Sequence, residues 1–314
     1  MDNSLLAVRD INHKYIVVER RNPMSIQDYI AENKAKNEQW REQKALEREE
    51  IKALSEESIL EATQKPEVYL KYLEVQAENP HYSASNILLA MKQNPNLTMI
   101  NSYDRWASIG RNVQRDSVGI KIRKAETYTK DGKKRTGYTT GYVFDISQTS
   151  GRNMPKKLVL TEKSPEMEQA LKKLLTLSPV SVEAERTLKT DAYYDPKTQK
   201  IFVALDLTDG ETFSALSREI VHAKVHDGGK YEYYNRQESE LDADSVSYML
   251  CKHFGIARNP PEAAHIYSLN NGLEIADRRA VLDLVQQIFR SMEETIQKEF
   301  TLPERRQSPQ RQVR

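Results

Sequence analysis

One segment constrains the fold of this chain more than any other. It reads Ser217-Arg218-Glu219-Ile220-Val221-His222 and is followed, eighteen residues after His222, by Glu240-Leu241-Asp242-Ala243-Asp244. With a histidine at position 218 it would be H-E-x-x-H followed by E-x-x-A-D, the ligand pattern of a zinc peptidase whose third ligand is a glutamate on the next helix. Positions 218 and 222 lie on one helix face, so both side chains can reach one ion. The pattern therefore predicts two neighbouring helices of a zincin-like domain.

The residue at position 218 puts the chemistry of that domain in question. In an intact site Glu219 would be the general base, and His222 and Glu240 would bind the metal. Arg218 stands where the first ligand is expected. A guanidinium group stays protonated, has no lone pair to donate and repels a dication.

Three outcomes follow for this site. In the first, the domain binds no metal, and Arg218 pairs with Glu219 or Glu240 in place of the ion. In the second, a shifted zinc site uses His222 and His226, also four residues apart, with Glu240 or Asp244. In the third, a peptidase stays active with two ligands only. His226 is equally well explained as a histidine at a helix C-terminus, where the helix dipole favours it.

The composition indicates a soluble protein of about two domains. The chain has 314 residues, 38% of them apolar and 30% charged, with a formal net charge of +1. No apolar run is long enough for a transmembrane helix, and residues 1–20 lack the features of a signal peptide, so we expect no membrane partner. Cys251 is the only cysteine, which excludes an intrachain disulfide and fits the cytoplasm.

The pattern along the chain predicts an α+β protein in five segments. Residues 1–54 form an N-terminal extension whose charged helix begins near Ser25. Residues 55–150 form a small α+β domain, residues 151–164 a linker, and residues 165–302 a mostly α domain that includes the zincin-like helices. Residues 303–314 are a polar tail that we expect to be disordered.

Short alternating strands dominate the second half of the small domain. Gly119 to Arg123 has period two, with Ile120 and Ile122 on one face and Lys121 and Arg123 on the other. Asp131-Gly132 is a hairpin-turn signal, and the returning strand ends near residue 146.

Basic and aromatic residues are interleaved in the same region. Between Arg105 and Arg135 there are ten basic and three acidic residues, and Trp106, Tyr128, Tyr138 and Tyr142 lie within or just beyond this span. Single-stranded nucleic acids bind basic grooves whose aromatic side chains stack on bases. A basic hairpin can equally be a solvated surface, and Trp106 can equally be part of the core.

The order of motifs in this region resembles the N-terminal domain of ArdC-type antirestriction proteins and their LtrC-like relatives. The resemblance rests on Asn79-Pro80-His81-Tyr82-Ser83-Ala84-Ser85-Asn86, Gln93-Asn94-Pro95, Trp106, Gly110-Arg111, Val113, Gly119-Ile120-Lys121-Ile122 and Phe144-Asp145-Ile146-Ser147-Gln148-Thr149. It implies a sequence-tolerant single-stranded DNA-binding domain of mobile elements, followed by a zinc-peptidase-like domain. The DNA-contacting residues would be Asn86, Trp106, Arg111, Lys121, Arg123 and Tyr138. In the second domain, the resemblance makes Asp244 a residue that orients a metal ligand.

Three hypotheses for function follow. The first is a DNA-binding accessory protein of a mobile element, acting in antirestriction or conjugation, with an inactive peptidase-like domain and no cofactor. The second is a zinc metallopeptidase that acts on DNA-associated proteins, against which Arg218 counts. The third is a non-catalytic scaffold that binds a protein partner through residues 25–54.

Overall fold

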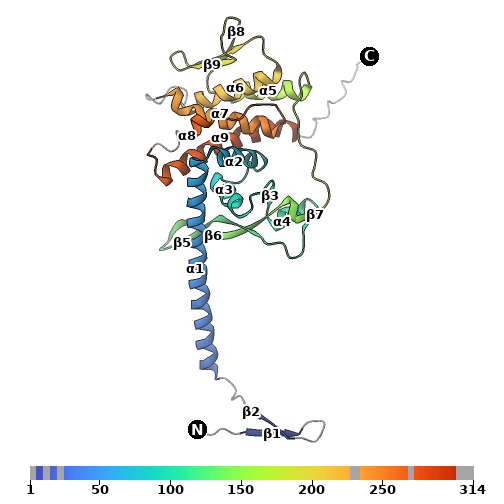
Figure 1. Ribbon diagram of the computed structural model, residues 1–314, viewed down its shortest axis with the longest axis vertical. Coiled ribbons are helices and arrows are strands. Elements are labelled where there is room, and N and C mark those ends of the chain that lie inside the picture. Colours follow the sequence, from blue (N-terminus) through green and yellow to red (C-terminus); the bar gives the residue numbers. More distant parts are fainter. Residues whose placement is uncertain (1–4, 10–14, 20–24, 227–233, 268–271, 302–314) are drawn as a thin grey trace, which may run out of the picture. The chain divides into compact units, whose positions relative to one another are not determined.

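The computed structural model describes residues 5–9, 15–19, 25–226, 234–267 and 272–301. Helices and small sheets are mixed along the chain, which confirms the predicted α+β class (Figure 1). The chain divides into two compact units, Met1–Glu50 and Ile51–Arg314. The tail predicted at 303–314 lies outside the described residues, and the other domain boundaries remain predictions.

The first unit contains a strand pair and the beginning of a long helix. Strands β1 (Leu5–Arg9) and β2 (Tyr15–Glu19) are antiparallel. Helix α1 (Ile26–Gln64) follows, and the Ser25 hydroxyl accepts a hydrogen bond from the Asp28 amide at its start (3.2 Å). From residue 26 to 42 every side chain of α1 is exposed, and ion pairs such as Lys36–Glu32 run along it. The predicted solvated, charged helix is confirmed and extends ten residues beyond its expected end at Leu54.

The second unit begins with helices that pack around small sheets. The helices are α2 (Pro66–Glu78), α3 (Ala84–Gln93), α4 (Tyr103–Ser108) and the 3-10 turn η1 (Ile146–Gln148). The strands are β3 (Ile100–Asn101), β4 (Arg111–Val113), β5 (Ile120–Lys130), β6 (Lys133–Asp145) and β7 (Thr149–Gly151). One antiparallel sheet has the order β3-β6-β5, and β4 pairs with β7.

The β5–β6 hairpin turns at Asp131-Gly132, as the sequence predicted. Both residues have positive φ, 53° and 70°, which is the backbone of a type I′ turn. The register pairs Ile120 with Val143 and Lys130 with Lys133, so the two strands stay aligned over the whole length of β5.

The rest of the second unit is mostly helical. Its helices are α5 (Pro165–Leu177), α6 (Asp209–Val225), α7 (Arg236–His253), α8 (Ala263–Tyr267) and α9 (Ile275–Thr301). A small sheet places β10 (Lys200–Ala204) between the parallel strand β8 (Ser181–Glu185) and the antiparallel strand β9 (Ala192–Asp195).

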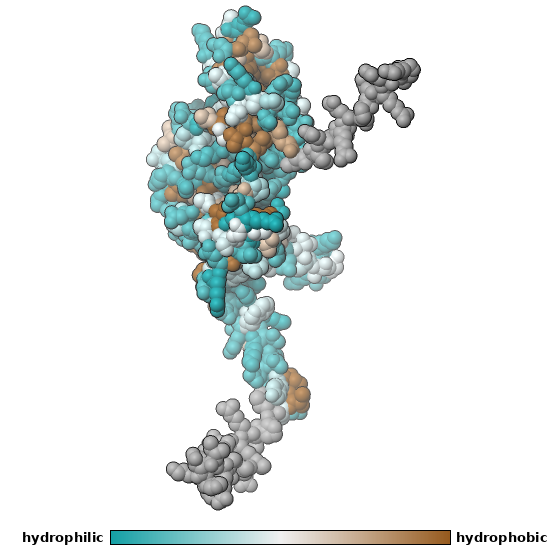
Figure 2. Space-filling view, turned by 90° about the vertical axis from the view of Figure 1, so that its right-hand side faces the viewer, coloured by the Kyte–Doolittle hydropathy of each residue, from teal (hydrophilic) through white to brown (hydrophobic). Residues whose placement is uncertain are grey.

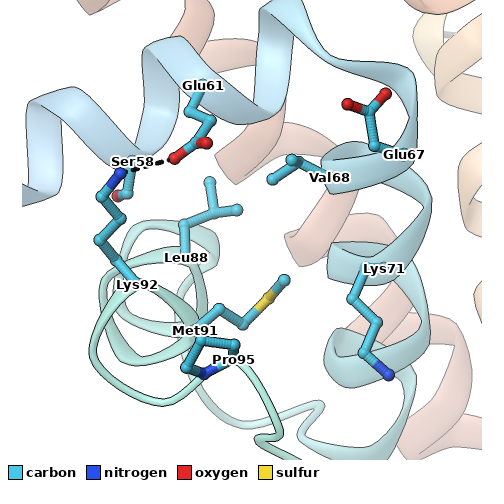
Figure 3. A pocket seen from close by; sticks show the side chains of 9 residues that line it. All are labelled: Ser58, Glu61, Glu67, Val68, Lys71, Leu88, Met91, Lys92 and Pro95. Atoms are coloured by element: carbon cyan, nitrogen blue, oxygen red, sulfur yellow. Dashed lines mark hydrogen bonds and ion pairs between the residues drawn. The ribbon is translucent and has the colours of Figure 1, made fainter.

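A continuous core joins the two halves of this unit. Helix α7 packs on α6, α9 and α2, and the Tyr69 hydroxyl lies 2.9 Å from the Ser245 hydroxyl across the α2–α7 contact. A pocket of about 420 Å³ remains where the last turns of α1 meet α2 and α3; its apolar wall includes Leu88 and Met91, and the Lys92–Glu61 ion pair spans its rim (Figure 3).

One face of the molecule can be described by the hydropathy of its residues. Figure 2 shows hydrophilic residues over most of the face turned to the viewer, with apolar patches among them. Within the described ranges, no helix combines the length and the apolar character that a bilayer crossing requires.

Candidate functional site

The helix pair α6–α7 brings the zincin-like residues together. A capping box starts α6, because the Thr208 hydroxyl accepts from the Glu211 amide and the Glu211 carboxylate accepts from the Thr208 amide. This fixes the register of α6 and directs position 218 toward α7. As the sequence predicted, α6 and α7 lie side by side.

Arg218 occupies the centre of the cluster. Its guanidinium group donates to Glu219 Oε1 (2.8 Å) and Asp244 Oδ1 (2.9 Å) and forms an ion pair with Glu240. The side chain therefore contacts all three carboxylates of the motif: the expected general base Glu219, the expected ligand Glu240 and the expected orienting residue Asp244. This is the pairing that the first of the three sequence outcomes describes.

A second arginine, Arg236, also pairs with the acidic residues of the motif. The sequence did not predict this contact. Arg236 donates to both carboxylate oxygens of Glu219, at 2.7 and 2.8 Å, and its Nε lies 3.8 Å from Glu240 Oε2. The ring of Tyr193 lies 5.2 Å from its guanidinium carbon. The signal that could have identified Arg236 is its position four residues before Glu240 on one helix face.

Glu219, the expected general base, is fully engaged. Its side chain is 1% exposed, and Oε1 accepts from both arginines. Oε2 accepts from Arg236 and from the backbone amide of Tyr194 on β9 (2.7 Å). A carboxylate held by four donors is a structural anion, because a general base must reach a water or substrate proton.

Asp244 is held by a third arginine from beyond the end of α7. Arg258 donates to Asp244 Oδ1 at 2.7 Å and forms a hydrogen bond with the Ser214 hydroxyl. His265 Nδ1 lies 3.8 Å from the other carboxylate oxygen. The cluster thus balances three carboxylates with three guanidinium groups, so its formal charge is already neutral without an ion.

The two histidines are oriented by tyrosines. His222 is 0% exposed, and its Nδ1 lies 2.9 Å from the Tyr234 hydroxyl. His226 Nδ1 lies 2.7 Å from the Tyr194 hydroxyl, and the ring of Tyr234 stacks on His226 at 4.7 Å. Each imidazole therefore forms a hydrogen bond with a tyrosine hydroxyl through one ring nitrogen, and Tyr234 contacts both histidines.

The residues present do not fit a divalent metal. Among the described residues, His222 Nε2 is buried without a hydrogen-bond partner, a feature that an ion would explain. That nitrogen lies 3.4 Å from Glu240 Oε2, however, and Glu240 is already paired with Arg218. Within the described ranges, no group of three or more His, Cys, Asp or Glu side chains is arranged to hold a metal ion. A dication here would have to displace two arginines.

The charge state of His222 leads to a prediction for stability. Burial, with the nearby Arg236 and Arg218, lowers its pKa from 6.5 to about 2. The unfolded chain therefore binds a proton at this residue below pH 6.5, while the folded chain does not. This contribution to stability is complete above pH 6.5 and falls as the pH drops, by about 1.4 kcal/mol per pH unit.

Urea unfolding near neutral pH and at about pH 5.5 measures the contribution of His222 to the free energy of unfolding. The wild-type chain should lose roughly 1.4 kcal/mol more than the His222→Gln variant over that interval. Equal losses in the two proteins would mean that His222 is protonated in the folded state.

The β5–β6 hairpin carries the second candidate site. Ile120 and Val143 are buried on one face, so the alternation of the strands places Lys121, Arg123, Tyr138 and Tyr142 on the other. We call these four residues the outer face. Tyr138 is 52% and Tyr142 47% exposed, and the Arg123 guanidinium lies 4.4 Å from the Tyr138 ring centroid.

Two other residues expected to contact DNA have structural roles. Trp106 is 0% exposed, and its indole N–H donates to the Phe144 carbonyl oxygen (2.8 Å). The expectation that Trp106 stacks on bases is therefore wrong, because its ring is part of the core. The guanidinium of Arg111 donates to the Thr149 hydroxyl and to the carbonyl oxygens of Thr149 and Arg152, which ties β4 to the β7 segment.

Asn86 and Gln93 explain part of the motif pattern in structural terms. The Asn86 amide exchanges hydrogen bonds with the backbone N–H and C=O of Arg123, at 2.9 and 3.0 Å. The Gln93 amide does the same with the backbone N–H and C=O of Lys121, at 2.9 and 2.7 Å. The two side chains are seven residues apart on α3 and bind alternate residues of β5. They cover the edge of β5 as a neighbouring strand would, and thereby fix the outer face relative to α3.

Comparison with known proteins gives distant similarities. No protein-family model matches the chain. It is 21% identical over 319 residues to the uncharacterised protein pXO2-81 of Bacillus anthracis, an alignment that covers 84% of this chain and 54% of that protein. The chain thus spans about half the length of this curated relative.

Two crystal structures of the antirestriction protein ArdC from the R388 plasmid are also similar. The metal-free structure has 17% identity and a TM-score of 0.47, and the similarity covers 69% of this chain and 84% of that one. The Mn(II)-bound structure has 16% identity and a TM-score of 0.46, and the similarity covers 70% and 89%.

Proposed function

We propose that this chain is a single-stranded DNA-binding accessory protein of a mobile genetic element, acting in antirestriction or conjugation. The outer face of the β5–β6 hairpin carries the proposal. It combines cations with exposed aromatic rings at a fixed spacing on a rigid hairpin. Those are the two components that sequence-tolerant single-strand binding needs.

In the proposed mechanism, the basic side chains and the tyrosines of the outer face have different roles. Lys121 and Arg123 attract the phosphate backbone, and Tyr138 and Tyr142 stack on bases. Arg123 over Tyr138 forms a cation–π pair that presents charge and ring together. Because neither contact reads base edges, we expect little sequence preference. The ArdC-type motif order in residues 79–149 directs the proposal toward mobile elements.

In this proposal α6–α7 is a scaffold. Its ion pairs take the place that a metal has in a zinc peptidase, and Glu219 has no role in chemistry. ArdC binds Mn(II) in one of its crystal structures. In this chain, Arg218 and Arg236 contact both Glu240, the carboxylate expected to bind a metal, and Glu219, the expected general base. The alternative hypothesis, a metallopeptidase, requires Arg218 and Arg236 to move away from these carboxylates so that a metal can bind.

The salt dependence of DNA affinity tests the proposal. Fluorescence anisotropy with a labelled, mixed-sequence single strand should give an affinity that falls steeply as salt is raised, because each phosphate contact releases counterions. A double-stranded oligonucleotide of the same length is the control and should bind more weakly. Affinity that stays flat with salt, or an absence of single-strand binding, would contradict the proposal.

A further inference from the structure

A cavity in the second unit lies away from both candidate sites. It has a volume of about 710 Å³ and is lined by the segment after α2, by β3 and α4, by residues 154–158, and by α7 and α9. It therefore lies between the strand-containing half of the second unit and its long C-terminal helix. A volume of this size suits a small organic ligand.

One oxygen of a buried carboxylate in the cavity wall lacks a hydrogen-bond partner among the described residues. Glu293 on α9 is 5% exposed, and its Oε2 has no hydrogen-bond partner among the described residues. The other oxygen lies 3.3 Å from His253 Nε2, and His253 Nδ1 is 2.7 Å from the Ala77 carbonyl oxygen. His253 is thus held between α2 and α9 and fixes the orientation of the carboxylate. An unsatisfied buried acceptor is costly, so a donor from a ligand would relieve it.

The lining also contains cationic side chains. Arg105 and Lys156 are exposed side chains of the cavity wall. Lys157 also lines it, but it is paired with Glu78. The cavity therefore offers positive charge for an anionic group and a buried acceptor for a donor group. Half-buried Tyr82, also in the wall, adds an aromatic ring.

We propose that this cavity binds one nucleotide of the single strand, with the exocyclic amine of the base donating to Glu293 Oε2 and the phosphate near Arg105 and Lys156. A carboxylate that accepts from cytosine N4 is an established way to recognise this base edge. The inference rests on the proposed function and extends it: the outer face binds any sequence, and the cavity selects a base that carries an amine.

Calorimetric titration of the full chain with deoxycytidine monophosphate and thymidine monophosphate tests the inference. Thymine has no exocyclic amine, so the cytidine nucleotide should bind at least about tenfold more tightly, as expected for a hydrogen bond to a buried charge. Deoxycytidine without its phosphate should bind more weakly than its monophosphate. Equal affinity for the two nucleotides, or an absence of binding at millimolar concentration, would overturn the inference.

Two variants test which residues bind the base and which bind the phosphate of the nucleotide. Glu293→Gln keeps the size of the side chain and should remove the preference for the cytidine nucleotide. Glu299→Gln, on the same helix but paired with Lys173 outside the cavity, should not change it. The double variant Arg105→Ala, Lys156→Ala should remove the advantage of the monophosphate over the nucleoside. This second variant keeps the test decisive if Glu293→Gln does not fold.

The outcomes separate this inference from the proposed function. Salt-dependent binding of the single strand without binding of the mononucleotides overturns the cavity assignment alone. Binding of the cytidine nucleotide without binding of the single strand overturns the role of the outer face alone.

Discussion

Replacing Arg218 by alanine is expected to lower the free energy of unfolding by about 3 kcal/mol. Removing one partner of a buried ion pair costs roughly 3 to 5 kcal/mol, because a charge stays buried without compensation. Arg218 is 26% exposed, so solvent screens part of this cost and the lower end of the range applies. The variant would leave Glu240 with only the longer contacts to His222 and Arg236, while Glu219 and Asp244 keep arginine partners.

Urea unfolding followed by circular dichroism measures this loss. Arg290→Ala is the matched control, since Arg290 pairs with Glu294 four residues away at the surface of α9. Exposed pairs of this kind contribute less than about 1 kcal/mol. Equal losses in the two variants would mean that the arginine cluster does not hold α6 and α7 together.

Reversing the charge of the outer face is expected to weaken single-strand binding on the order of a hundredfold or more. The double variant Lys121→Glu, Arg123→Glu removes two phosphate contacts and adds two repulsive charges. The slope of affinity against salt concentration should also become shallower. The amides of Asn86 and Gln93 bind the backbone of these two residues, so the hairpin edge can remain in place.

Anisotropy titrations at low salt measure the effect. The matched control is Lys172→Glu, Lys189→Glu, which changes the net charge equally at exposed positions outside the hairpin. If the control loses as much affinity as the outer-face variant, binding reflects the net charge of the protein and not this surface.

Local sequence signals predicted several elements of the fold. The helix pair α6–α7, the charged helix that begins near Ser25 and the hairpin turn at Asp131-Gly132 all follow from signals within a few neighbouring residues. The pairing of Arg218 with acidic side chains followed from the motif, because the expected ligands are acidic and lie near it. Helix α1 continued past its expected end because its last turns pack into the core, which local charge patterning does not reveal.

The features that the sequence did not predict depend on contacts between segments that are distant in the chain. Arg258 reaches Asp244 and Ser214 only because the chain turns back after α7. Trp106 fits an aromatic-rich basic segment by sequence, yet α4 packs it against β6. Asn86 matched a motif with an expected role in DNA binding, and its amide instead binds the edge of β5. A match to a spaced motif does not show whether a residue contacts a ligand or stabilises the fold.

We propose that arginines stand where a metal would bind, so that the function rests on binding and not on peptidase chemistry. Elemental mass spectrometry of the full-length, tag-free chain, after dialysis against zinc and then against buffer, tests it most directly. We expect far less than one zinc per chain, and no difference between the wild-type protein and the His222→Ala variant. Stoichiometric zinc that is lost in His222→Ala would contradict it, because His222 would then be a ligand and the guanidinium groups would have to leave the site.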